Sequence, residues 1–273
     1  MKSVVAAPPT DAPHSIANEA ACLNCDHAMA QGLYCPHCGQ PRPHRLSVTH
    51  VLHELLHVFT HADKSIFAYI RHVLLQPGHV VADYVAGRRK RYFNPFQFLL
   101  LAVGAATLLT TVGHYYEATG HGLQQRLHSS LTAEQLVWVE SYFTLLGKYQ
   151  NLWWLLLLLP IYSLIAWGVY RPRRVNYAEA LLIFVVVGAA FHIVWVAVLV
   201  GLVLFMGPFS GTSNLAALLQ VVVMVSYLTL IGRRALGLST AGSLWRAAVI
   251  VLLGAACGAG FNYLAFQLYV FGR

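Results

Sequence analysis

The chain has 273 residues, of which 58% are hydrophobic and only 10% are charged. This balance excludes an ordinary water-soluble domain, in which about a quarter of the residues are charged. The formal net charge of +8 gathers beside the apolar runs, so it favours an anionic membrane surface over nucleic acid as the partner.

The first residues, 1–20, are expected to form a disordered tail. They contain one lysine and adjacent prolines, and they lack the apolar run of a signal peptide. A cleaved secretory signal is therefore not expected.

A metal-binding module is predicted over residues 21–42. Two CxxC pairs, Cys22–Cys25 and Cys35–Cys38, are separated by nine residues. Each pair can fold as a knuckle that directs two thiolates to one point, with Gly32 and Gly39 available for the turns. The pattern favours a structural Zn²⁺ site with four thiolates, which supplies folding free energy and leaves no open position for chemistry.

Iron in the same cage and disulfide bonds are the alternatives for these four cysteines. Disulfides are disfavoured because thiols stay reduced on the cytoplasmic side, where the charge pattern described below places this module. The fifth cysteine, Cys257, lies among small residues of a predicted span and is expected to pack there.

Residues 46–93 are predicted to form amphipathic helices at the membrane interface, followed by a basic segment. Helices are expected over 50–61, 63–75 and 77–86, because their apolar residues recur with the helical period. The third is expected to begin at Pro77, because proline is favoured at the first position of a helix.

The polar side of the first of these helices contains His53, Glu54 and His57, which match the HExxH pattern of zinc metalloproteases. In those enzymes the histidines bind zinc and the glutamate activates a water. No motif places a third ligand, and an interfacial helix offers no sheltered cleft. A solvated face is therefore favoured, with a weak metal or pH-sensitive surface and a membrane protease as alternatives.

Four consecutive cations precede the first span, namely Arg88, Arg89, Lys90 and Arg91. We expect them to contact anionic lipid headgroups, each gaining about 1 kcal/mol. The alternative is that they bind a phospholipid headgroup as substrate or effector, or an acidic partner.

Residues 94–273 are predicted to form the transmembrane domain, because a span needs about 20 mostly apolar residues. Five spans are expected, at 95–115, 151–170, 179–206, 214–232 and 245–269. The fourth is the weakest, since polar residues dilute it. The predicted fold class is thus an all-α polytopic membrane protein with an N-terminal zinc ribbon and amphipathic linker helices.

Lysine and arginine predict the orientation. Of the 18 in the chain, fifteen lie before the first span or close to the connections that follow the second and fourth spans. The N-terminus is therefore expected in the cytoplasm and the C-terminus outside.

The long outer connection, 117–149, contains Thr132 and Gln135, which resemble a capping box before an apolar stretch. A helix over 133–147 is expected to lie on the outer membrane face. The alternative is that it extends the second span.

His192 lies in the middle of the third span, and an ionisable residue at that depth is a functional candidate. A neutral imidazole bonded to a neighbouring helix is the favoured interpretation, with Asn262 and Gln267 of the fifth span as candidate partners. The alternative is that these residues line the path of a small transporter or channel.

Short motifs follow one another in a specific order along residues 22–100. They are the CxNC and CxxCGQ knuckles, Pro77-Gly78, Tyr84, Gly87-Arg88-Arg89, Tyr92 and Asn94-Pro95. Together they resemble an uncharacterised bacterial family, domain of unknown function 3667. The resemblance implies a zinc-ribbon membrane protein and brings no assigned reaction.

These observations favour a non-enzymatic adaptor or sensor of the bacterial inner membrane, whose cytoplasmic zinc ribbon docks a protein partner. The lipid bilayer and its anionic headgroups are the other expected partners, and homo-oligomerisation stays open. No catalytic residue is assigned.

Overall fold

The computed structural model describes residues 21–29, 32–42, 45–48, 66–206 and 213–272, with the backbone alone at 199, 201–206 and 213–217. The tail 1–20 and the predicted helix 50–61, with its HExxH match, therefore lie outside the described residues. The described elements are α2 (Ile66–Leu75), α3 (Pro77–Val85), η1 (Arg89–Arg91), α4 (Pro95–Val112), α5 (Tyr115–Leu127), α6 (Ala133–Trp153), η2 (Trp154–Leu158), α7 (Leu159–Tyr170), η3 (Arg171–Arg173), α8 (Tyr177–Met206), α9 (Ser213–Arg234) and α10 (Thr240–Phe271).

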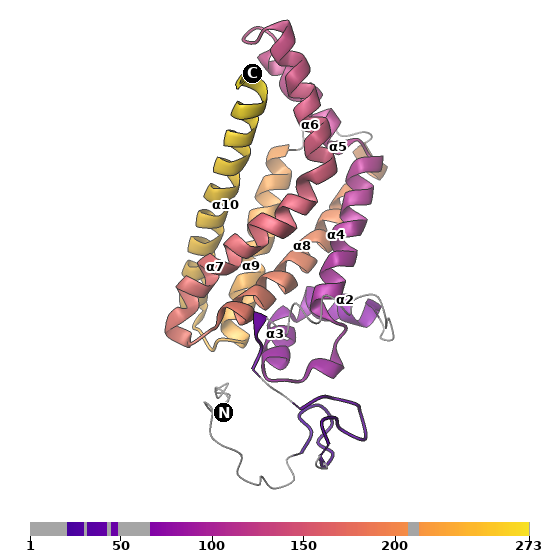
Figure 1. Ribbon diagram of the computed structural model, residues 1–273, viewed down its shortest axis with the longest axis vertical. Coiled ribbons are helices and arrows are strands. Elements are labelled where there is room, and N and C mark those ends of the chain that lie inside the picture. The colour runs from indigo at the N-terminus through magenta and orange to yellow at the C-terminus, as the bar shows by residue number, and fades with distance from the viewer. Residues whose placement is uncertain (1–20, 30–31, 43–44, 49–65, 207–212, 273) are drawn as a thin grey trace.

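The predicted all-α membrane fold is confirmed. Four helical segments of the described chain are long and apolar enough to cross a membrane: Arg89–Val112, Ala133–Arg173, Tyr177–Val198 and Thr240–Phe271. They coincide with the first, second, third and fifth predicted spans. A long helix, α9, occupies the place of the fourth. The helices form an elongated bundle, with the cysteine module at one end and the C-terminus at the other (Figure 1).

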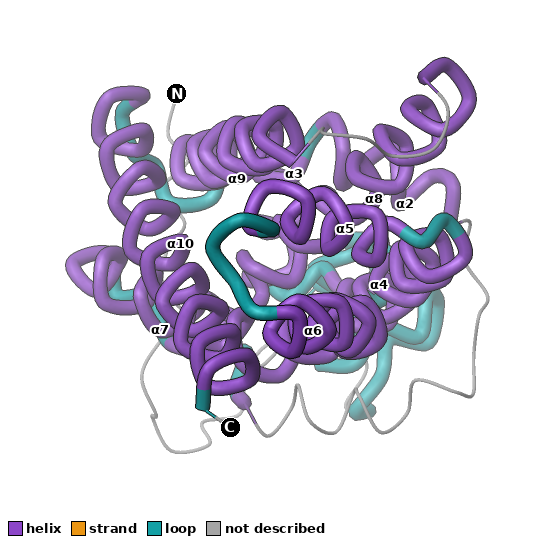
Figure 2. The backbone as a smooth tube through the Cα atoms, turned by 90° about the horizontal axis from the view of Figure 1, so that it is seen from above, coloured by secondary structure: helices purple, strands orange, loops and turns teal. Residues whose placement is uncertain are grey.

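Helix α8 lies at the centre of the bundle. It contacts α4, α7 and α9, and its residues from Ala178 to Ala190 are buried except for Leu181. A helix that is apolar on all sides is suited to such a position, since every face meets another helix. Seen along the bundle from the α5 end, α9 and α4 lie on either side of α8, and α7 and α10 lie at the opposite side of the bundle (Figure 2).

The prediction of a separate helix over 133–147 on the outer membrane face is wrong. The alternative, that this stretch extends the second span, is correct. From Ala133 to Arg173 the chain is one helical segment of 41 residues. It begins at the predicted capping box, where Thr132 and Gln135 exchange both hydrogen bonds. Pro160 does not end it, because the π-helical turn η2 just before the proline absorbs the interrupted hydrogen-bond pattern.

Helix α5 was not predicted. It packs against α6 as the other half of a hairpin, and a Cβ at Gly120 would lie 2.8 Å from Cβ of Phe143. This glycine therefore permits the close approach of the two helices.

Helices α2 and α3 lie across the end of the bundle nearest the cysteine module (Figure 1). Their apolar sides pack against α8 and α9, so that Tyr69 and Tyr84 are almost fully buried. A Cβ at Gly78 would lie 2.6 Å from Cβ of Arg234, which explains the glycine of the Pro77-Gly78 motif. At the start of α4, Asn94 caps the helix by accepting hydrogen bonds from two backbone N–H groups, as expected before Pro95.

Replacement of Gly254 by alanine is expected to lower the free energy of unfolding by about 1–3 kcal/mol, since overpacking forces neighbours to shift. A Cβ at this position of α10 would overlap the Tyr162 ring of α7. Unfolding of the purified protein in mixed detergent micelles measures the effect. Gly260→Ala, on the same helix with nothing within 4 Å of its Cβ position, is the matched control. An equal loss in both variants would contradict this packing.

Candidate metal centre and its attachment to the bundle

The two CxxC pairs fold as matching knuckles. In the first, the N–H of Cys22 donates to the carbonyl of His27 over 2.8 Å, and the N–H of Asp26 donates back to Cys22 over 2.8 Å. The second repeats this pattern, at 2.8 and 2.9 Å, in the bonds from Cys35 to Gln40 and from Gly39 to Cys35.

Both knuckles turn through a left-handed residue directly after the second cysteine. Its φ is 57° at Asp26 and 68° at Gly39. Gly39 was predicted to turn the chain, because glycine adopts this conformation without steric cost. Asp26 fills the equivalent place in the first knuckle, since a short polar side chain tolerates it better than most others.

The four sulfurs form a compact cluster. Sγ atoms are 3.6 Å apart for Cys22 and Cys38, 3.7 Å apart for Cys25 and Cys35, and all four lie within 4.8 Å of one another. Tetrahedral coordination with metal–sulfur distances of about 2.3 Å requires sulfur–sulfur separations of roughly 3.8 Å. A disulfide requires about 2.05 Å. The residues therefore fit a metal ion held by four cysteines.

The surroundings shift the pKa values of two of the thiols in opposite directions. A backbone hydrogen bond from His27 lowers the pKa of Cys25, but burial and the three neighbouring thiols raise it by more, to about 12. Burial raises the pKa of Cys38, while hydrogen bonds from Asn24 and Gln40 lower it by more, to about 6. A metal ion that binds all four sulfurs as thiolates therefore has to displace protons.

The core of this module is too small to fold on apolar burial alone. Its buried hydrophobic members are Cys22, Met29 and Cys35, against which Cys25 and Cys38 pack. Small modules of this kind depend on a metal or disulfides, and all five cysteines of the chain are free thiols here. The ion would supply folding free energy to this cage.

Gln40 attaches the second knuckle to the bundle. Its side-chain amide donates to the carbonyl of Gly87 over 2.6 Å, and its amide oxygen accepts from the N–H of Lys90 over 2.8 Å. Gln40 is 1% exposed, so loss of either bond would leave a buried polar group without its partner. The residue that closes the CxxCGQ knuckle therefore also binds the segment that leads into α4.

A second attachment follows a few residues later. Nε of Arg45 lies 3.1 Å from a carboxylate oxygen of Glu179, and the carbonyl of Leu46 accepts from the side chain of Asn176 over 3.0 Å. Asn176 and Glu179 also cap α8 by reciprocal hydrogen bonds. The same groups thus start the central helix and hold the end of the metal module.

The predicted basic segment is tied back to the protein. Asp83 lies 3.3 Å from Arg88 and 3.5 Å from Arg91, and it accepts a hydrogen bond from Tyr92. Arg89 lies over the ring of Tyr84. These contacts order the segment, and headgroup contact by Arg88, Arg89, Lys90 and Arg91 stays a prediction.

His192 is buried in the bundle core, and its hydrogen bond is made within α8 and not to a neighbouring helix as expected. It is 2% exposed, its Nδ1 lies 2.7 Å from the carbonyl of Gly188, and its ring meets Trp154 edge-on. Asn262, a candidate partner, instead donates to the carbonyl of Gly258 in its own helix. Neither of these bonds joins His192 to Asn262.

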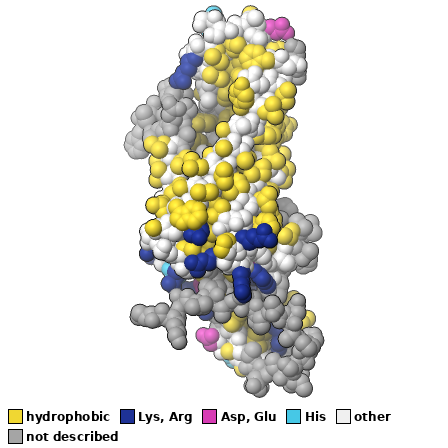
Figure 3. Space-filling model, turned by 90° about the vertical axis from the view of Figure 1, so that its left-hand side faces the viewer, with side chains coloured by type: hydrophobic (Ala, Val, Ile, Leu, Met, Phe, Trp, Pro, Cys, Tyr) yellow, Lys and Arg dark blue, Asp and Glu magenta, His cyan; other side chains and the backbone are white. Residues whose placement is uncertain are grey.

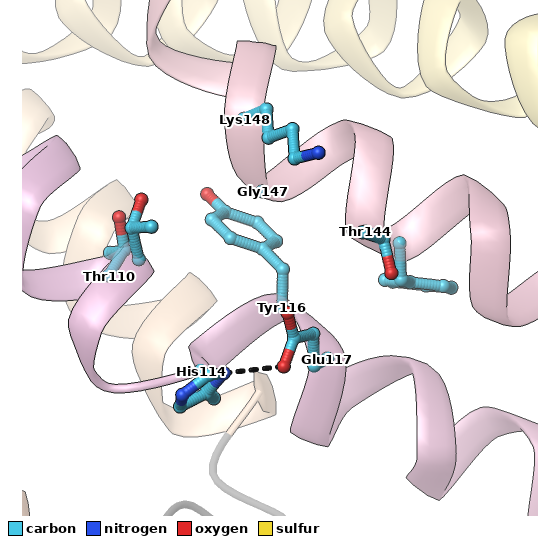
Figure 4. Close-up of a pocket in the computed structure, with 9 residues that line it drawn as sticks. Thr110, His114, Tyr116, Glu117, Thr144, Gly147 and Lys148 are labelled. Carbon is cyan, nitrogen blue, oxygen red and sulfur yellow. Dashed lines mark hydrogen bonds and ion pairs between the residues drawn. The ribbon is translucent and has the colours of Figure 1, made fainter.

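A small pocket of about 50 Å³ opens at the far end of the bundle, between α4, α5 and α6 (Figure 4). His114 and Glu117 at its edge pair with one another, and the hydroxyl of Thr110 donates to carbonyls of its own helix. Lys148 is left as its cationic group. This arrangement contains no nucleophile and base in contact, so we assign it no reaction.

The sequence pattern located the four clustered cysteines, but it did not identify Asp83, Arg45 or Glu179 as partners. The contact between Arg45 and Glu179 joins segments 134 residues apart, and no spacing rule predicts such a pair. Asp83 has local partners across the turn after α3, which the sequence analysis did not consider. Gln40 could be found only as part of the knuckle motif.

Comparison with known proteins supports the resemblance in part of the chain. A family model described as "Protein of unknown function (DUF3667)" matches residues 63–106. This range contains α2, α3, the basic segment and most of α4, whereas the cysteine module lies outside it. No curated protein and no solved structure matches the chain.

The purified protein is expected to contain one metal ion per chain, which Cys35→Ser removes or greatly weakens because the cage loses one thiolate. Metal content by elemental mass spectrometry measures this. Cys257→Ser removes a thiol that lies outside the cluster and should leave the content unchanged. Equal metal content in the wild type and Cys35→Ser would contradict the site.

Proposed function

We propose that this chain is a non-enzymatic adaptor or sensor of the bacterial cytoplasmic membrane, whose zinc ribbon is held on the cytoplasmic face and docks a protein partner. The observation that carries the proposal is the double role of the second knuckle. Cys35 and Cys38 face the metal cage, while Gln40 binds the segment before α4. Metal loading and the placement of the ribbon on the bundle are thereby linked.

Zinc is the metal that the ligand set favours. Four thiolates at tetrahedral separations are typical of structural zinc sites, and iron is the alternative for the same cage. A closed shell of four protein ligands leaves no position for a substrate or an activated water. A structural rather than catalytic role is therefore proposed.

The charge distribution supports a cytoplasmic ribbon. The arginines after α7 and at the end of α9 lie at the same end of the bundle as the ribbon, where dark blue side chains border the apolar surface (Figure 3). Positive residues are retained on the cytoplasmic side of such proteins. In the reducing cytoplasm the four thiols would stay available to a metal.

The ribbon presents apolar side chains that its own fold does not cover. Leu33 is 76% exposed, Tyr34 63% and Leu23 41%. Exposed apolar and aromatic side chains on a rigid module favour contact with another protein. We propose that they contribute to the docking surface.

Affinity purification from native membranes tests docking. A partner that copurifies with the wild type and with Cys257→Ser is expected to be lost with Cys35→Ser/Cys38→Ser, because the ribbon unfolds without its metal. Leu33→Ala/Tyr34→Ala should keep the metal and capture less of the same partner. Recovery of the same proteins with every variant would overturn the docking role.

Orientation is tested separately with a membrane-impermeant maleimide on intact cells. A cysteine placed at Gly122 in α5 is expected to react, whereas one at Arg173 should react only after the cells are permeabilised. Signal above that of the parent protein is the readout. The reverse pattern would place the ribbon outside and remove the cytoplasmic proposal.

A further inference from the structure

The cations at the ribbon end of the bundle fall into two groups. Arg45 pairs with Glu179, and Arg88 and Arg91 pair with Asp83. Within the described ranges, these two acids are thus already engaged. No ion pair there involves the following six arginines: Arg171, Arg173, Arg174, Arg233, Arg234 and Arg246.

Two of these arginines stack on tryptophan. The guanidinium carbon of Arg246 lies 4.4 Å from the ring centroid of Trp245, and that of Arg171 lies 5.6 Å from that of Trp167. Stacking occupies a face of the guanidinium and leaves N–H donors along its edge. One N–H of Arg246 donates to the carbonyl of Gly242, which helps to fix the group in place.

The two stacked pairs lie at the same level. Helices α7 and α10 pack together and run in opposite directions, with Gly254 against Tyr162. Eight residues further toward the ribbon end, this register places Tyr170 beside Arg246. Arg171 is the residue that directly follows Tyr170.

The surroundings are those of a membrane interface. Trp245 is 52% exposed, and Leu244 and Leu164 on the same two helices are about half exposed as well. In the face of the molecule that α7 and α10 form, arginine and lysine side chains lie directly below the apolar surface (Figure 3). Tryptophan is enriched where hydrocarbon meets headgroups.

We propose that Arg171 and Arg246 form a binding site for the phosphate of an anionic phospholipid in the leaflet on the ribbon side. Their guanidinium edges would bind phosphate oxygens, since arginine binds phosphate with two parallel hydrogen bonds. Trp167 and Trp245 would lie at the depth of the glycerol, and the acyl chains would follow the exposed leucines. The paired cations around Asp83 are not part of this site.

Native mass spectrometry of the full-length protein in detergent tests the site, with phosphatidylglycerol and phosphatidylcholine as the added lipids. The wild type is expected to prefer phosphatidylglycerol, and Arg171→Gln/Arg246→Gln to lose about fivefold in affinity for each arginine removed. Arg173→Gln/Arg233→Gln removes the same charge from the same end and should retain most of the preference. Equal loss in both double variants would overturn a local site.

A charge-preserving variant separates geometry from net charge. Arg171→Lys/Arg246→Lys keeps both positive charges but loses the planar donors, so it should restore the preference only in part. Full restoration would show that charge alone attracts the lipid and would overturn the arginine–tryptophan site. A wild type that binds both lipids equally would do the same.

Discussion

The buried amide of Gln40 joins the two halves of this protein. Its backbone carbonyl closes the second knuckle, and its side chain binds the backbone on both sides of Arg88 and Arg89. A buried amide that loses its partners costs free energy, because water is not there to replace them. The metal module therefore cannot rearrange at this knuckle without disturbing the entry to α4, and the entry to α4 cannot shift without affecting the knuckle.

At the ribbon end of the bundle, other buried or partly buried polar groups also need partners within the protein. This end contains many cations and few acids. Glu179 pairs with Arg45 and also caps the start of α8, while Asp83 pairs with Arg91 and orders the turn before α4. Apolar helices surround them, so these polar groups gain from partners within the protein. Because the two acids are already engaged, Arg171 and Arg246 keep guanidinium donors for another anion, and we propose a lipid phosphate as that anion.

Much of the fold followed from local pattern. Apolar runs of sufficient length located the long helices, the capping residues Thr132 and Asn94 located two helix starts, and the cysteine spacing located the metal cage. The outer helix was misplaced because amphipathic content alone does not distinguish an interfacial helix from the exposed end of a span. Helix α5 was missed because its polar sequence becomes a helix through packing against α6.

The sequence by itself determined that the chain is helical and membrane-embedded and that four thiols meet, since hydrocarbon thickness and the reach of a CxxC turn act over short stretches of chain. Only the tertiary structure decided that α8 is central, that His192 is buried with a bond inside its own helix, and that Gln40 and Arg45 hold the module on the bundle. Those outcomes depend on contacts between distant segments. Those contacts depend on the shapes of the packed helix surfaces, which the spacing of side chains along the chain does not reveal.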